Sequence, residues 1–290
     1  MSIIEHCGEA WRVIRTKRFP FLIMPVIDLI FFVVLGFVTA PLFDRIVLYA
    51  QSYFGSLAGP QLVDASLRGE SLINPLLLKL FLLYFILLLT FYAIYCLFQG
   101  FSWGLAARMF DVPLSEYLRK FAVANMLWVP LYGVIHMLDL AQLFQSAAAE
   151  RFGLEAPNLI PAIMVTLSLL LIYFAFTDYA LLMASNLSLR KRIAFAFRNG
   201  RIFLPIFFFF GLLFFAGNAV LLWVFSRSAV AGMVIGIVIL LPLFSFFRLV
   251  LNSAATTGIT LNNAHEKATL GVTHGNARTK KAQKASRKGS

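Results

Sequence analysis

Three charged side chains, Asp28, Asp178 and Arg248, lie inside long apolar stretches of this sequence. A charge at membrane depth costs about 2.5 to 3.5 kcal/mol on insertion scales, so each one needs a partner or a function. Arg248 can form an ion pair with Asp28 or with Asp178, and such a pair would hold helices together. The same charges can instead line a polar cavity that passes an ion, a proton or a substrate. We favour the structural ion pair over the cavity, and rank snorkelling to the interface third.

A second pair of ionisable residues, His136 and Asp139, lies one helical turn apart in another apolar stretch. This spacing is compatible with a proton relay. Asp139, however, falls close enough to the end of its stretch to be solvated. We therefore rank the relay below the other roles of intramembrane charges.

Gly100-Phe-Ser-Trp-Gly104 matches the Gly-x-Ser-x-Gly pattern of a hydrolase nucleophile. That pattern works only on a strained turn between a strand and a helix, and here it lies inside a long apolar run. We reject an intramembrane hydrolase acting through Ser102, and predict instead that Gly100 and Gly104 permit a close helix contact. No phosphate-binding lysine loop and no Cys/His metal spacing occurs in the sequence. The prediction is a protein that is not an enzyme and has no cofactor or metal.

The composition identifies the elements that carry these residues. Of the 290 residues, 60% are apolar and 13% are charged, whereas soluble domains average roughly 45 to 50% and about 25%. Six stretches are long enough and apolar enough to cross a bilayer. They are Phe19–Phe43, Leu80–Ala107, Phe121–Ala149, Ala156–Asn186, Ile202–Ser226 and Ser228–Leu251. The sequence therefore predicts an all-α polytopic membrane protein with six transmembrane helices.

The Lys and Arg residues predict the orientation of these helices. Nineteen of them fall in the two terminal segments and the even-numbered connections, against five in the odd-numbered ones. Because cytoplasmic segments keep the excess of Lys and Arg, both termini should be cytoplasmic. Residues 263–290 form a basic tail with few large apolar residues, and we predict that it is disordered. Beside a membrane, the tail is better matched to anionic lipid than to nucleic acid.

A threefold pattern divides residues 1–262 into units of about 1–110, 111–186 and 187–262. Each unit begins with a basic amphipathic stretch followed by a proline near the start of an apolar helix, at Pro20, Pro130 and Pro205. We predict an interfacial helix and a helical hairpin in each unit. The residues predicted to bind anionic lipid headgroups are Arg12, Arg15, Lys17, Arg18, Arg190, Lys191, Arg192, Arg198 and Arg201. The alternative is the ordinary excess of basic residues before any helix that leaves the cytoplasm.

Residues 176–188 and 193–199 carry a resemblance to a known family. This junction resembles one in the six-helix membrane domain that anchors some prokaryotic glycerophosphodiester phosphodiesterases and also occurs alone in other prokaryotic membrane proteins. The resemblance covers residues 1 to about 262 as architecture, and implies the cytoplasmic membrane of a prokaryote. It implies anchoring or scaffolding and transfers no catalytic residue, because no phosphodiesterase domain is attached.

The predicted function is that of a non-enzymatic scaffold or anchor, acting through protein partners or lipids. The alternative is a small secondary transporter or channel, with a polar cavity formed by Asp28, Asp178 and Arg248 near the cytoplasmic side. Pairing of these charges in a dry interior would favour the scaffold, and a water-filled cavity reaching them would favour transport.

Overall fold

The computed structural model describes residues 2–57, 75–151, 159–183 and 187–260. Helices dominate these residues, and no strand occurs among them. Six helical segments are long and apolar enough to cross a membrane: Arg18–Ser52, Leu78–Arg108, Leu114–Asp139, Pro161–Leu181, Gly200–Phe225 and Ala229–Thr260. The prediction of an all-α polytopic membrane protein with six spans is confirmed. The predicted disordered tail, 263–290, lies outside the described residues.

The helices follow one another in a simple order. They are α1 (Ile3–Thr16), α2 (Arg18–Leu57), α4 (Pro75–Arg108), α5 (Leu114–Arg151), α6 (Leu159–Leu181), α7 (Leu189–Arg198), α8 (Gly200–Phe225) and α9 (Ala229–Ile235). A π-helical turn, η1 (Gly236–Leu240), connects α9 to a helical segment over residues 241–260. Pro242 cannot donate a backbone hydrogen bond to the preceding turn, and the wider π turn just before it accommodates this.

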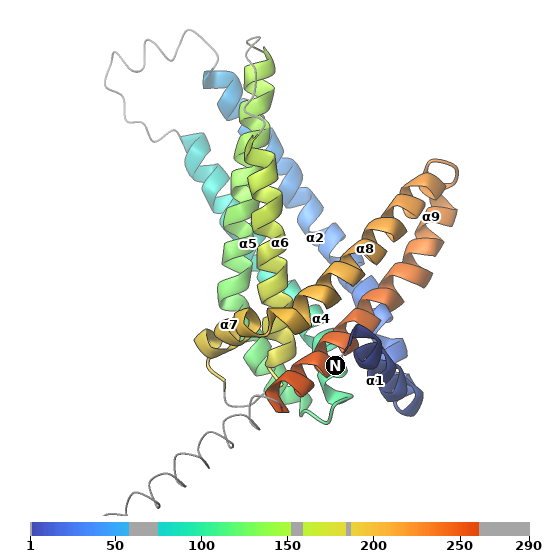
Figure 1. Ribbon diagram of the computed structural model, residues 1–290. Coiled ribbons are helices and arrows are strands. Elements are labelled where there is room, and N and C mark those ends of the chain that lie inside the picture. Colours follow the sequence, from blue (N-terminus) through green and yellow to red (C-terminus); the bar gives the residue numbers. More distant parts are fainter. Residues whose placement is uncertain (1, 58–74, 152–158, 184–186, 261–290) are drawn as a thin grey trace, which may run out of the picture.

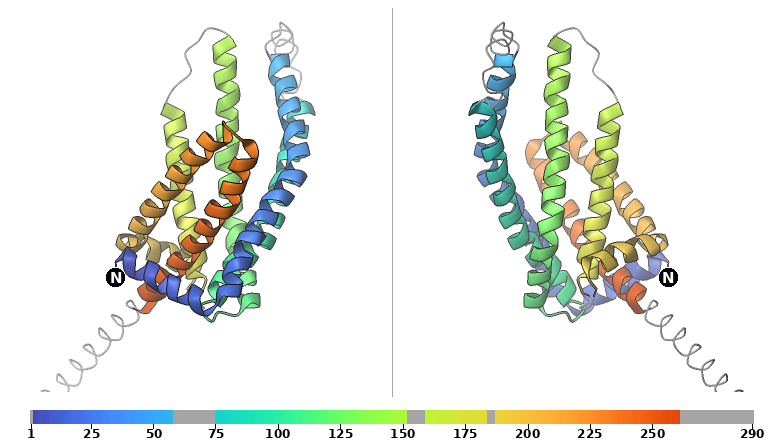
Figure 2. Two further views of the ribbon diagram at one scale, coloured as in Figure 1. Left: turned by 90° about the vertical axis from the view of Figure 1, so that its right-hand side faces the viewer. Right: turned by 90° about the vertical axis from the view of Figure 1, so that its left-hand side faces the viewer.

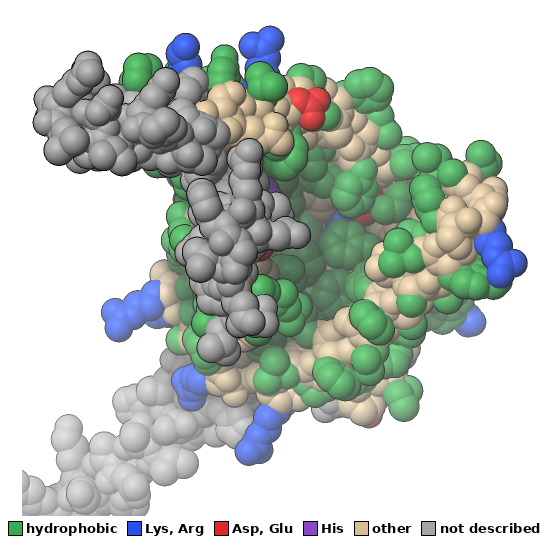
Figure 3. All heavy atoms as spheres, turned by 90° about the horizontal axis from the view of Figure 1, so that it is seen from above, with side chains coloured by type: hydrophobic (Ala, Val, Ile, Leu, Met, Phe, Trp, Pro, Cys, Tyr) green, Lys and Arg blue, Asp and Glu red, His purple; other side chains and the backbone are tan. Residues whose placement is uncertain are grey.

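The six spans form three antiparallel hairpins: α2 with α4, α5 with α6, and α8 with the helix from α9 to residue 260. The hairpins meet at one end of the bundle, where α1 and the end of the last helix also lie (Figures 1 and 2). Toward the other end the third hairpin diverges from the first two. Seen from that open end, the space between them is hollowed and lined largely by apolar side chains (Figure 3).

Two of the three predicted entry helices are separate from the spans that follow them. Helix α1 ends where Lys17 leaves helical geometry (φ −123°, ψ 59°), and α7 ends at Asn199 (φ −103°, ψ 23°). The second unit differs from the predicted arrangement, because α5 runs without a break from Leu114 past Pro130. The third span consequently starts at Leu114 instead of Phe121.

The closed end of the bundle is packed around aromatic side chains. The ring of Tyr179 lies 4.6 Å from that of Phe121 and 5.5 Å from that of Trp103, measured between centroids. Helices α4 and α5 approach closely here. A Cβ atom on Gly104 would lie 2.5 Å from Leu114 Cδ1, and one on Gly100 would lie 3.1 Å from Phe121, so larger residues would not fit at these positions without a shift. The glycine pair thus allows the close helix contact expected from its spacing.

Candidate functional site

The centre of the closed end is an ion pair between Asp28 on α2 and Arg248 on the last helix. Arg248 Nη1 donates to Asp28 Oδ2 at 2.6 Å, and Nη2 donates to Oδ1 at 2.9 Å. Both residues have 0% of their surface exposed. The parallel two-bond geometry is the strongest arrangement available to a guanidinium and a carboxylate. Of the two partners that the sequence left open for Arg248, the structure selects Asp28.

Helix α4 supplies polar partners to both members of this pair. Gln99 Oε1 accepts a hydrogen bond from Arg248 at 2.6 Å, and Gln99 Nε2 donates to Asp28 at 3.1 Å. Ser102 Oγ accepts a bond from Arg248 Nη1 at 2.5 Å. Gln99 and Ser102 are three residues apart, so they share one helix face. These four residues, here called the Asp28–Arg248 network, therefore join the first, second and sixth spans.

Aromatic rings complete the surroundings of the Arg248 charge. The centre of the guanidinium lies 4.2 Å from the centroid of Phe244 and 5.6 Å from that of Trp103. A cation over an aromatic face gains electrostatic attraction, and most when water is excluded. The hydrogen bonds and rings together offset part of the hydration that the charge has lost, and Arg248 Nε is left without a hydrogen-bond partner among the described residues.

Ser102 is engaged by Arg248, and no described hydrogen bond connects it to a histidine. It is also fully buried. A serine nucleophile needs a base that takes its proton, whereas the guanidinium of Arg248 is a permanent donor. The arrangement therefore makes Ser102 a structural acceptor of a hydrogen bond from Arg248.

Asp178 lies in a second buried network that joins the second hairpin to α7. Its Oδ2 accepts a hydrogen bond from Trp128 Nε1 at 2.9 Å, and its Oδ1 accepts one from Arg192 Nε at 2.5 Å. Arg192 also donates from Nη1 to the carbonyl oxygen of Leu187 at 2.7 Å. The sequence placed Arg192 among the lipid-facing cations, but the structure turns it inward, and only 11% of its side chain is exposed.

The other predicted lipid-binding cations occupy different environments. Lys17 donates to the carbonyl oxygen of Met109 at 2.9 Å and to Asp111 Oδ1 at 2.7 Å, which joins the start of α2 to the end of α4. The remaining seven side chains belong to exposed residues: Arg12, Arg15, Arg18, Arg190, Lys191, Arg198 and Arg201.

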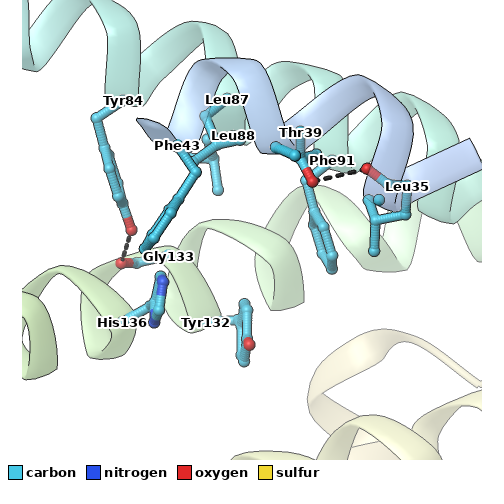
Figure 4. Close-up of a pocket in the computed structure, with 12 residues that line it drawn as sticks. Leu35, Thr39, Phe43, Tyr84, Leu87, Leu88, Phe91, Tyr132, Gly133 and His136 are labelled. Carbon is cyan, nitrogen blue, oxygen red and sulfur yellow. Dashed lines mark hydrogen bonds between the residues drawn. The ribbon is translucent and has the colours of Figure 1, made fainter. Parts of the chain in front are cut away.

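His136 lines a cavity of about 410 Å³ between α2, α4 and α5 (Figure 4). Its ring stacks on that of Tyr132 with centroids 6.1 Å apart, and Tyr84 donates to the nearby carbonyl oxygen of Gly133 at 2.5 Å. Asp139 is exposed and does not line this cavity. No hydrogen bond among the described residues joins His136 to Asp139, so the proton relay is not assembled in this conformation.

Helix α1 docks on the end of the last helix through a polar contact that the sequence analysis did not identify. His6 is 1% exposed, and its Nδ1 lies 3.2 Å from Ser253 Oγ. The Ser253 hydroxyl donates to Glu9 Oε2. His6, Ala10 and Ile14 are spaced four residues apart and form the buried face of α1. This spacing is the signal by which the sequence could have revealed the docking face.

Comparison with known proteins gives no match: no protein-family model, no curated protein and no solved structure matches this chain. The resemblance to the membrane domain of glycerophosphodiester phosphodiesterases stays a prediction. Within the residues that the structure describes, no group of three His, Cys, Asp or Glu residues is placed to hold a metal ion.

Asp28→Asn should destabilise the protein by about 3 to 5 kcal/mol, because it leaves the Arg248 charge buried without a counter-charge. The measurement is the free energy of unfolding in detergent, with unfolding induced by heat or by denaturant. Asp44→Asn is the matched control, since Asp44 is exposed on the same helix and should change stability by less than about 0.5 kcal/mol. The double variant Asp28→Asn/Arg248→Met should recover part of the loss. Equal stability of Asp28→Asn and Asp44→Asn would contradict a structural ion pair.

Docking of α1 should weaken as the pH falls below about 6.5. Burial lowers the pKa of His6 below its ordinary value of 6.5, although nearby Glu9 and Glu5 oppose the shift. The undocked histidine therefore binds a proton more readily than the docked one, and docking is fully favoured only above the ordinary pKa.

The labelling rate of Cys7 reports this docking, because Cys7 lies on α1 and is partly buried against the core. The rate is measured in a Cys96→Ala background, so that Cys7 is the cysteine that is labelled. The rates are normalised to those of an exposed cysteine introduced at Ser2. Relative labelling should rise between pH 7 and pH 5 in this background and stay flat when His6→Gln is added. Parallel pH profiles for the two proteins would exclude His6 as the responsible group.

Proposed function

We propose that this chain is a non-enzymatic membrane scaffold whose three hairpins are locked together at one end by buried ion pairs. The observation that carries the proposal is the Asp28–Arg248 network, in which both charges are completely buried and hydrogen-bonded to each other. Breaking such a pair is strongly unfavourable, so it holds three spans in one arrangement. A fixed arrangement of spans is what an anchor for partners or lipids requires.

The alternative, a transporter, needs intramembrane charges that are accessible to the transported ion or solute. Asp28 has both carboxylate oxygens engaged by Arg248, and Asp178 has both engaged by Trp128 and Arg192. Neither carboxylate lines the three cavities described for this molecule, which have volumes of about 410, 790 and 770 Å³. These contacts favour a structural role for both aspartates.

The apolar surface of the three hairpins also supports the scaffold proposal. Large apolar side chains are exposed on all three hairpins, among them Phe37 on α2, Val134 on α5 and Phe215 on α8. Their exposure suits contact with lipid chains or with the apolar surface of a membrane partner. The scaffold would thus combine a rigid closed end with an open end offering apolar surface.

We also propose that the closed end faces the cytoplasm, on the basis of the excess of Lys and Arg in its connections. The resemblance noted above favours the cytoplasmic membrane of a prokaryote. A green fluorescent protein, which folds in the cytoplasm but not after export through the general secretion pathway, should fluoresce when fused after residue 290. Loss of fluorescence at equal expression would mean that the C terminus lies on the other side of the membrane, and the proposed orientation would be wrong.

The scaffold and transporter proposals differ in the access of water to the network. Ser102→Cys places a thiol inside the Asp28–Arg248 network, and Thr177→Cys places one next to Asp178 in the chain. Both positions are fully buried, and neither change removes a charged residue. In a background lacking Cys7 and Cys96, neither should react in membranes with a small charged methanethiosulfonate. Thr16→Cys, at an exposed position, should react rapidly. Labelling of Ser102→Cys that an added ion or solute blocks would overturn the scaffold in favour of transport.

A further inference from the structure

An apolar groove of about 790 Å³ lies between α6 and α8 and is closed from behind by the last helix. Helix α8 lines it with a stripe that includes Gly200, Leu204, Phe208 and Gly211, spaced three or four residues apart. Such spacing places the four on one face of the helix. Helix α8, which lines the groove, diverges from α6 toward the open end of the bundle (Figure 1).

The groove is long enough to cross the hydrocarbon core of one bilayer leaflet. Its lining on α8 extends from Gly200 to Phe214, which at 1.5 Å per residue is about 21 Å along the helix axis. The hydrocarbon core of one leaflet is about 15 Å deep, and α8 is inclined to α6. The back wall is aromatic, formed by Phe244 and Phe247. An extended hydrocarbon chain fits such a wall without leaving a polar group unpaired.

Two basic residues adjoin, in the chain, the residues at the beginning of the groove. Phe197 and Gly200 line its beginning, where α7 gives way to the fifth span. Arg198 and Arg201 follow these two residues in the chain and are exposed. No ion pair joins either arginine to an acidic group within the described part of the chain. The carboxylate of Asp178 is already bonded to Arg192. The charges of Arg198 and Arg201 are therefore free to bind an external anion.

We propose that this groove binds one anionic membrane phospholipid, with an acyl chain between α6 and α8 and the phosphate held by Arg198 and Arg201. The argument is one of complementarity: an apolar channel of leaflet depth begins beside two unpaired cations at the membrane boundary. Arginine binds phosphate oxygens through paired N–H groups, and each basic residue near an anionic surface contributes favourably. The site does not depend on the scaffold role, because it uses none of the residues of the Asp28–Arg248 network.

Gly211→Trp tests the apolar part of the site. A Cβ atom at Gly211 would have nothing within 4 Å, so a large side chain should enter the groove without disturbing the helix packing. Gly36→Trp is the matched control, because Gly36 also has open space around a Cβ atom but lines the separate cavity beside His136. The charge part is tested by Arg198→Gln/Arg201→Gln. Its control is Arg108→Gln/Arg119→Gln, which removes one exposed cation from α4 and one from α5.

The experiment is native mass spectrometry of the full chain in detergent, titrated with phosphatidylglycerol or phosphatidylcholine. The wild type should bind one phosphatidylglycerol in preference to phosphatidylcholine, and Gly211→Trp should lose that bound lipid. Arg198→Gln/Arg201→Gln should reduce the preference by about 30-fold, the equivalent of about 1 kcal/mol for each basic residue. Both controls should behave as the wild type does.

Two results would overturn the proposal. Binding of phosphatidylglycerol that is unchanged by Gly211→Trp would mean that the lipid lies elsewhere on the surface. Equal binding of the two lipids by the wild type would mean that Arg198 and Arg201 do not select an anionic lipid, which contradicts the proposal. Either result leaves the labelling test of Ser102→Cys unaffected, so the failure of this site is distinguishable from the failure of the scaffold.

Discussion

The structure depends on one constraint: a carboxylate and a guanidinium removed completely from water must satisfy each other. Desolvating two ions costs several kcal/mol each, and their attraction offsets this only when the geometry is good and the remaining polar atoms find partners. Asp28 and Arg248 are held by two direct hydrogen bonds and the support of Gln99 and Ser102, while Arg248 Nε has no hydrogen-bond partner among the described residues. Because these residues belong to three different spans, the constraint fixes the relative positions of those spans.

The polar interactions also account for the difference between the two ends of the bundle. Asp28–Arg248, Asp178–Arg192 and the contact of His6 with Ser253 all connect elements at the closed end. The third hairpin has no comparable polar connection to the others further along its length among the described residues. Lipid chains are as apolar as the helices, so little drives bare apolar surfaces together inside a membrane. The hairpins therefore stay together where they are polar and diverge where they are not.

The basic residues of this chain serve two purposes that composition does not separate. Arg192 and Arg248 point inward and neutralise buried carboxylates, while Arg198 and Arg201 remain exposed beside an apolar groove. The first pair stabilises the bundle, and the second is available to an anionic ligand. The proposed scaffold and the proposed lipid site therefore use different basic residues of the same bundle.

The sequence by itself determined the six spans, because length and apolarity are local properties that the bilayer thickness converts directly into helices. It also singled out Asp28, Asp178 and Arg248, because a charge in an apolar stretch is visible without any structure. It left open which aspartate pairs with Arg248, since both lie at a similar distance from the closed end. Only the packing of the helices, which sets the direction in which each side chain points, decided for Asp28. The same physical reason applies to Arg192. The sequence shows that Arg192 belongs to a basic stretch, but the side chain points inward because the fold places Asp178 within hydrogen-bonding distance of it.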